Sequence, residues 1–151
     1  MHFRERLTVP PAYWVLLVLF ALSLALAFGF YLGLAWAIGI GLATILLGGA
    51  VFWSAATVIS VSDTEVRVGR AMIEVAYLSG VVSLSEEEAR VRRGPGADAR
   101  AYLVLRPFVS TAVELTVDDA DDPVPYWLVA TRHPREFAAA VESLLVDRLP
   151  E

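Results

Sequence analysis

The fold of this chain is decided by two apolar stretches, YWVLLVLFALSLALAFGF (Tyr13–Phe30) and LAWAIGIGLATILLGGAVFWSAA (Leu34–Ala56). They lie inside a longer segment, Leu7–Ser62, that contains no charged residue. A helix of about 20 apolar residues is long enough to cross the hydrocarbon core of a bilayer. We therefore predict two transmembrane helices in contact with membrane lipid, joined by a short turn at residues 29–33.

Two other interpretations of the apolar segment are weaker. A cleaved signal peptide has a short apolar core that ends at a small-residue cleavage site, whereas this apolar run continues far beyond such a length. A helical hairpin buried in a soluble protein keeps one polar face, and neither stretch has one. The membrane interpretation is therefore preferred.

The charges that flank the two helices predict their orientation. Arg4 and Arg6 precede the first helix, Arg67 and Arg70 follow the second, and the turn has no positive charge. Cytoplasmic flanks carry an excess of positive charge. We expect a multi-pass protein of the cell membrane with two helices and both termini in the cytoplasm.

The second helix has a face of small residues, formed by Gly39, Gly41, Gly48 and Gly49. Small residues allow helices to approach closely. We expect this face to pack against the first helix, with a homo-oligomer through the same face as the alternative. No ionisable residue lies in either helix, which argues against an ion or proton pathway.

Composition excludes several kinds of chemistry. The chain has 151 residues, no Cys and a net charge of −5, so disulfides, thiolate metal sites and a Cys nucleophile are all excluded. Nearly all of the charge follows residue 62, where ten Arg stand against 16 Asp and Glu. An acidic domain argues against nucleic acid as a partner, because phosphate binding needs a basic surface.

After the apolar segment, short alternating stretches predict a mostly β domain that ends in a helix. A helix from Pro134 buries residues spaced i, i+3, i+4 and i+7, beginning at Phe137. The expected strands cover residues 57–62, 65–69, 71–78, 80–85, 101–106, 110–117 and 126–131. The predicted fold class is a membrane α-helical hairpin plus an α+β domain, built as a small antiparallel β-barrel or sandwich closed at one end by the C-terminal helix. This is the layout of pleckstrin-homology-like domains.

These patterns divide the chain into three parts. We expect residues 1–11 to be a cytoplasmic tail, residues 12–56 to be the transmembrane hairpin and residues 57–151 to be the cytoplasmic domain.

The residues of the domain do not form a recognisable catalytic, cofactor or metal site. The acidic run at residues 118–122 lacks the glycine that turns a calcium loop and is expected to be a solvated turn. His133 is the only His in the domain and stands where a helix begins, so a structural role is more natural than catalysis. We expect no enzyme activity, no cofactor and no bound metal.

One group of residues is a candidate for partner binding. Arg106, Phe108, Tyr126 and Trp127 place one Arg and three aromatic residues on neighbouring predicted strands. Such residues are enriched in interfaces, and an Arg can stack on Trp127. The alternative is that the aromatic side chains belong to the core of the domain.

Three stretches resemble an actinobacterial membrane-protein family catalogued as domain of unknown function 3093. They are RERLTVPPAYW (Arg4–Trp14), AYLVLRPFV (Ala101–Val109) and DDPVPYWLVATRHPREFAAAV (Asp121–Val141). The resemblance covers almost the whole chain, and PYWLVATRHP is its most specific part. It implies a topology and a lineage, but no reaction and no catalytic or ligand residues.

The favoured function is a non-catalytic, membrane-anchored binding or scaffold module. Its domain would offer a groove or a sheet edge to a protein at the inner leaflet. One alternative is an accessory subunit or small oligomeric membrane component that works through its helices. An enzyme that acts on a membrane-associated substrate is the weakest alternative.

Overall fold

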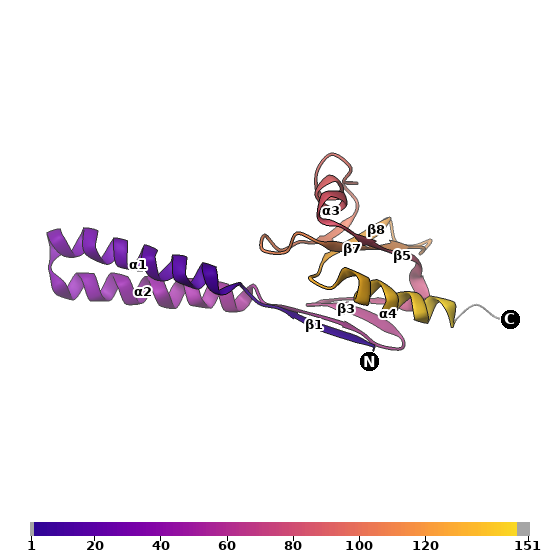
Figure 1. Cartoon of the computed structure of the whole chain (residues 1–151), viewed down its shortest axis with the longest axis horizontal. Helices are drawn as coiled ribbons and strands as arrows, with labels where there is room; N and C mark the ends of the chain where they lie inside the picture. The colour runs from indigo at the N-terminus through magenta and orange to yellow at the C-terminus, as the bar shows by residue number, and fades with distance from the viewer. Residues whose placement is uncertain (1, 148–151) are drawn as a thin grey trace. The chain divides into compact units, whose positions relative to one another are not determined.

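The computed structural model describes residues 2–147 and separates the chain into two compact units. One unit is Thr8–Ala56, and the other combines the residues up to Leu7 with those from Thr57 onward. The first unit is therefore an insertion between two segments of the second (Figure 1).

The inserted unit is a pair of long apolar helices, α1 (Pro11–Leu32) and α2 (Leu34–Ser54). Pro11 suits the first helical turn, where its missing N–H is not needed. Gly33 joins the helices at a φ of +92°, a conformation that glycine adopts more readily than other residues. Both helices are long and apolar enough to cross a membrane. Ala21 is buried in α1, and no residue of α2 is buried.

The N-terminal segment is a strand, β1 (Phe3–Leu7), where we expected a tail. It pairs antiparallel with β2 (Thr57–Val61), from Phe3↔Val61 to Leu7↔Thr57. Glu5 and Leu7 face the interior while Arg4 and Arg6 are exposed, which is the alternation of a half-buried strand. The segment is too short for this alternation to be distinguished from a charged tail.

Sheet A contains β1, β2, β3 (Glu65–Val68) and β4 (Ala71–Glu74) in that order. All of its neighbouring strands are antiparallel. The β2–β3 hairpin confirms the pairing predicted for residues 57–69.

Sheet B contains four strands in the order β5-β7-β8-β6. A short 3-10 helix, Val75–Tyr77, leads from sheet A into it. The β6–β8 pair is parallel, so this sheet is mixed where we expected only antiparallel pairs. The strands are β5 (Leu78–Leu84), β6 (Tyr102–Val104), β7 (Ala112–Val117) and β8 (Tyr126–Ala130).

Two helices complete the domain. The C-terminal helix α4 (Pro134–Val146) packs between the two sheets, and α3 (Glu86–Arg93) covers the other face of sheet B (Figure 1). Phe137 of α4 is fully buried and stacks on Phe3 of β1 with ring centroids 5.3 Å apart. The structure thus confirms an α+β region with a C-terminal helix. This helix separates two sheets, whereas we expected it to close the end of a curled one.

Candidate functional site

Tyr126 and Trp127 belong to the interior of the domain. They are adjacent in β8, so their side chains point to opposite faces of sheet B. Tyr126 is 5% exposed and Trp127 is 7% exposed. Trp127 lies in the main core with α4 and sheet A, while Tyr126 lies in a smaller core beneath α3. The two residues therefore do not form one surface.

Tyr126 holds the loop that follows α3. Its hydroxyl accepts a hydrogen bond of 2.9 Å from the backbone N–H of Asp98. The guanidinium of Arg92 stacks over its ring at 4.6 Å. We expected an Arg to stack on Trp127. The structure instead shows Arg92 of α3 stacked on Tyr126.

Trp127 supports the exposed edge of sheet B. Its ring contacts that of Tyr102 in β6, with centroids 4.6 Å apart. Tyr102 and its neighbour Leu103 are 41% and 40% exposed. In the described part of the chain β6 pairs only with β8, so its outer side is an open sheet edge.

Arg106 and Phe108 continue the chain from this edge. The Nε of Arg106 donates to the hydroxyl of Thr57 at 3.1 Å, so the side chain reaches from sheet B to the start of β2. Phe108 is half-buried against the main core, and the guanidinium of Arg132 lies 5.9 Å from its ring centre. We call Tyr102–Val104 together with residues 105–108 the β6 edge. It contains Arg106 and Phe108, is supported by Trp127, and excludes Tyr126.

Sequence reasoning missed a polar contact centred on Glu5. This carboxylate is 8% exposed and accepts hydrogen bonds from the Thr131 hydroxyl at 2.5 Å and the Arg132 backbone N–H at 3.1 Å. The Nδ1 of His133 lies 3.3 Å from it. Glu5 thereby ties β1 to the junction between β8 and α4. The alternation of residues 3–7 was the only signal for this contact.

The arginines of α3 also have structural partners. Arg92 donates two hydrogen bonds to the carboxylate of Glu114 in β7, at 2.5 and 2.7 Å. These bonds raise the pKa of Arg92, against a smaller lowering by burial. Arg93 donates to the backbone carbonyls of Ala89 and Val109 at 3.0 and 3.3 Å. The bonds of Arg92 fasten α3 to sheet B, and the bond of Arg93 to Val109 links α3 to the segment that precedes β7.

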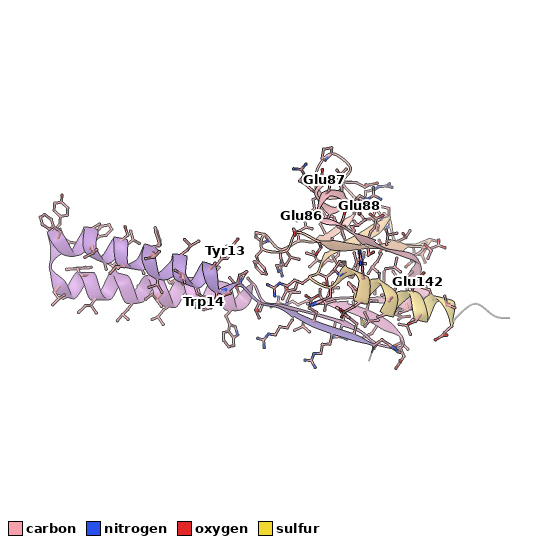
Figure 2. All side chains as sticks on the ribbon, in the orientation of Figure 1. Tyr13, Trp14, Glu86, Glu87, Glu88 and Glu142 are labelled. Carbon is pink, nitrogen blue, oxygen red and sulfur yellow. The ribbon has the colours of Figure 1, made fainter. Side chains whose placement is uncertain are left out.

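A capping box begins α3. The Ser85 side chain and the Glu88 backbone N–H are hydrogen-bonded, and the Glu88 carboxylate accepts from the Ser85 backbone at 2.9 Å. The Ser85 hydroxyl, and then its backbone N–H, hold the pKa of Glu88 below its ordinary value. Figure 2 shows Glu86, Glu87 and Glu88 together at this helix, where negative charge suits the N-terminal end of the helix dipole.

The acidic run forms a turn. Carboxylates of Asp119 and Asp122 accept hydrogen bonds from the backbone N–H groups of Asp121 and Val124, at 3.0 and 2.9 Å. Within residues 2–147, no group of three or more His, Asp or Glu side chains is arranged to hold a metal ion.

The glycines of α2 differ in their surroundings. A Cβ on Gly48 would overlap Leu17 of α1, and Cβ atoms on Gly41 and Gly49 would lie 3.5 and 3.6 Å from Ala25 and Trp14. Gly39 faces open space. Figure 2 shows Trp14 and Tyr13 at the beginning of α1.

Sequence reasoning missed a further close approach between the helices. A Cβ on Gly29 of α1 would lie 2.7 Å from the Cβ of Ala37 in α2. Close packing between α1 and α2 therefore accounts for Gly29 and Gly48. Gly41 and Gly49 also face α1, but at distances that leave room for a Cβ, and Gly39 does not face α1.

The fold defines a class: an α+β domain with an apolar helical hairpin inserted after its first strand. The chain belongs to the family described as Protein of unknown function (DUF3093), whose model matches residues 2–141. This match confirms that the three sequence stretches belong to the family catalogued as domain of unknown function 3093. Neither the curated proteins nor the solved structures contain a match.

Proposed function

We propose that this protein is a non-catalytic, membrane-anchored binding module. Its helical hairpin crosses the cell membrane twice, both termini lie in the cytoplasm, and its domain presents an edge to a protein partner at the inner leaflet. This proposal assigns no cofactor, metal or nucleic acid to the protein.

The observation that carries the proposal is the exposure of the hairpin's apolar side chains. Phe30, Leu46 and Leu26 are 86%, 71% and 68% exposed, and most other large side chains of α1 and α2 are also exposed. An apolar surface that is continuous over two helices is not stable in water. Lipid is the environment that such helices require, since their backbone polar groups are already satisfied within each helix.

The orientation rests on charge. Arg4 and Arg6 precede α1, Arg67 and Arg70 follow α2 in sheet A and its turns, and residues 7–62 carry no charge. An excess of Arg on the side of the termini favours their retention in the cytoplasm.

The β6 edge is the part of the domain best suited to a protein partner. Tyr102 and Leu103 expose apolar surface beside backbone groups that a further strand can pair with. Because β6 is only three residues long, the added strand would be short and would depend on contacts with these two side chains.

We also propose that the domain is a distant variant of the pleckstrin-homology-like fold, in a chain of actinobacterial origin. The C-terminal helix and the many short strands support this relationship. The parallel β6–β8 pair and the position of α4 between two sheets argue against a close one.

Proximity labelling in cells, followed by capture of the full chain from detergent-solubilised membranes, tests the binding role. We expect a small, reproducible set of neighbours that is lost in Leu103→Glu and retained in Val82→Glu. Val82 is a matched control because it is 53% exposed on β5, at the opposite edge of sheet B. The same neighbours with Leu103→Glu, or diffuse labelling of general membrane proteins, would contradict a role for this edge.

A groove in the hairpin supports a second candidate function, assembly through the helices. The groove has a volume of about 480 Å³, and its lining includes the small residues Ala21, Ala25, Ala37 and Gly41 among larger apolar side chains. Small residues of this kind receive a neighbouring helix. In that case Gly41→Leu would reduce chemical crosslinking between copies, whereas Leu103→Glu would not.

A further inference from the structure

The outer face of sheet A carries four arginines in an ordered arrangement. Arg4 and Arg6 of β1 are exposed, and the register aligns Arg4 with Ser60 of β2 and Ser60 with Arg67 of β3. Arg70 lies in the β3–β4 turn, next to Gly69, whose N–H donates to the Val58 carbonyl. We call these four residues, Arg4, Arg6, Arg67 and Arg70, the basic face.

Three of these arginines lack an internal partner. Within residues 2–147, the side chains of Arg4, Arg6 and Arg70 make no hydrogen bond or ion pair, whereas Arg67 pairs with Glu65 at 2.9 Å. Arginines elsewhere in the domain, such as Arg92, Arg93 and Arg106, are used to hold the fold together. Free guanidinium groups are thus concentrated on one face.

The charge of the basic face changes along its strands, from arginines at one end to acidic residues at the other. Arg6 and Arg70 lie at the end where Leu7 pairs with Thr57, and Arg4 and Arg67 follow one row further along. Glu65 and Glu74 lie opposite each other at the far end. With Asp63 of the β2–β3 turn counted in the same way as Arg70 of the β3–β4 turn, the face has four arginines against three acids, a net of +1, in a chain whose net charge is −5.

The basic end of the face is the end that continues into the hairpin. Residues 8–10 separate β1 from α1, and residues 55–56 separate α2 from β2. Chain geometry limits the Leu7–Pro11 connection to about 14 Å and the Ser54–Thr57 connection to about 11 Å. If the hairpin spans a membrane, Arg6 and Arg70 are therefore held near its surface.

We propose that the basic face binds the anionic phospholipid headgroups of the membrane that the hairpin crosses. This inference rests on the membrane anchoring proposed above and assigns a ligand to a surface of the domain. An arginine near an anionic surface contributes about fivefold in affinity, so the three free arginines together contribute roughly 100-fold. The anionic headgroups would repel the end of the face that carries Glu65 and Glu74. Sheet A would therefore tilt with its arginine end toward the membrane.

The test uses the full chain in vesicles of phosphatidylcholine, with and without phosphatidylglycerol. Because the chain has no Cys, Met72→Cys places one fluorophore on the basic face, in the row of Arg4 and Arg67. Met72 is 50% exposed. Val82→Cys places the same fluorophore on sheet B as a control. A quencher attached to lipid headgroups reports contact with the membrane surface.

We expect quenching at Met72→Cys to be stronger in the anionic vesicles and to fall to the level of neutral vesicles in about 1 M salt, where charges are screened beyond about 3 Å. The triple change Arg4→Gln, Arg6→Gln and Arg70→Gln should abolish the difference between the two lipids, and the three Arg→Lys changes should preserve it. Arg135→Gln is the matched control, because Arg135 is exposed on α4 and has no internal polar partner within residues 2–147.

Extraction of the vesicles with alkaline carbonate separates failure of this inference from failure of the anchor. A chain that resists extraction but shows equal quenching in both lipids, or is unchanged by the triple Gln variant, overturns the headgroup assignment alone. A chain that carbonate removes overturns both the anchor and this inference, which depends on it.

Discussion

Three consecutive charged residues of β1 have different roles because a strand alternates its faces. Arg4 and Arg6 are exposed, while Glu5 between them is buried and bonded to Thr131 and Arg132. A buried carboxylate is tolerated only when its acceptor capacity is used, as it is here. The loss of stability on removing a charged side chain from β1 therefore depends on whether that side chain faces the interior or the solvent.

Glu5→Ala should lower the free energy of unfolding by about 3 kcal/mol, because it leaves the Thr131 hydroxyl and the Arg132 N–H without their buried partner. Chemical denaturation of the full chain in mild detergent, followed by circular dichroism, measures the change. Arg4→Ala on the same strand should change stability by less than about 0.5 kcal/mol. Equal effects of the two changes would contradict the assigned role of Glu5.

The stability of the start of α3 should depend on pH through Glu88. Its pKa is lowered in the folded state, chiefly by the Ser85 hydroxyl, so its contribution to α3 is fully present above the ordinary glutamate pKa. The contribution is lost as pH falls through the lowered pKa. Ser85→Ala should raise the pKa of Glu88, and the start of α3 should then fray at a higher pH.

NMR titration of the Glu88 carboxyl measures this shift, and Ser143→Ala in α4 is the control that should leave it unchanged. An unaltered Glu88 titration in Ser85→Ala would show that the capping box does not form in solution.

At the scale of elements, α3 is attached to sheet B mainly through Arg92. Its guanidinium bonds Glu114 in β7 and stacks on Tyr126 in β8, so one side chain contacts two strands. Arg92→Ala should weaken the docking of α3 by about 1–2 kcal/mol, a value reduced by the partial exposure of Arg92.

Hydrogen exchange of the α3 amides measures this docking, and roughly tenfold faster exchange is expected. Arg90→Ala removes only the exposed pair with Glu87 and should leave exchange nearly unchanged. Similar exchange in the two variants would exclude Arg92 as the main attachment.

The two helices of the hairpin depend on close approach at Gly48. Gly48→Leu should separate α1 and α2, because even a Cβ there overlaps Leu17. Gly39→Leu should not, because that position faces open space. Distances between spin labels on the two helices would show the separation, and equal distances in both variants would contradict this packing.

At the scale of the whole molecule, the sequence predicted the elements with strong periodic patterns. The uncharged run predicted α1 and α2, the alternation of residues 57–69 predicted the β2–β3 hairpin, and the spacing from Phe137 predicted α4. These patterns are local, so they can be read without knowledge of contacts distant in sequence.

The features that were missed depend on contacts between distant segments. β1 pairs with a strand about 55 residues later in the chain, and β6 pairs parallel with β8. For the candidate site, Arg106 and Phe108 were expected on a strand beside Tyr126 and Trp127. Adjacency in a strand is enough to point Tyr126 and Trp127 to opposite faces, but the core that each side chain joins depends on contacts distant in sequence. Residue type alone does not separate a binding aromatic residue from a core one.

The central claim is that the hairpin crosses the cell membrane with the domain on the cytoplasmic side. Because the chain has no Cys, single cysteines at Tyr31, beside the α1–α2 turn, and at Glu142, exposed on α4 (Figure 2), report each side separately. We expect a membrane-impermeant thiol reagent applied to intact cells to label Tyr31→Cys, and to label Glu142→Cys only after the cells are opened. Labelling of Glu142→Cys in intact cells, or protection of both positions, would contradict the claim.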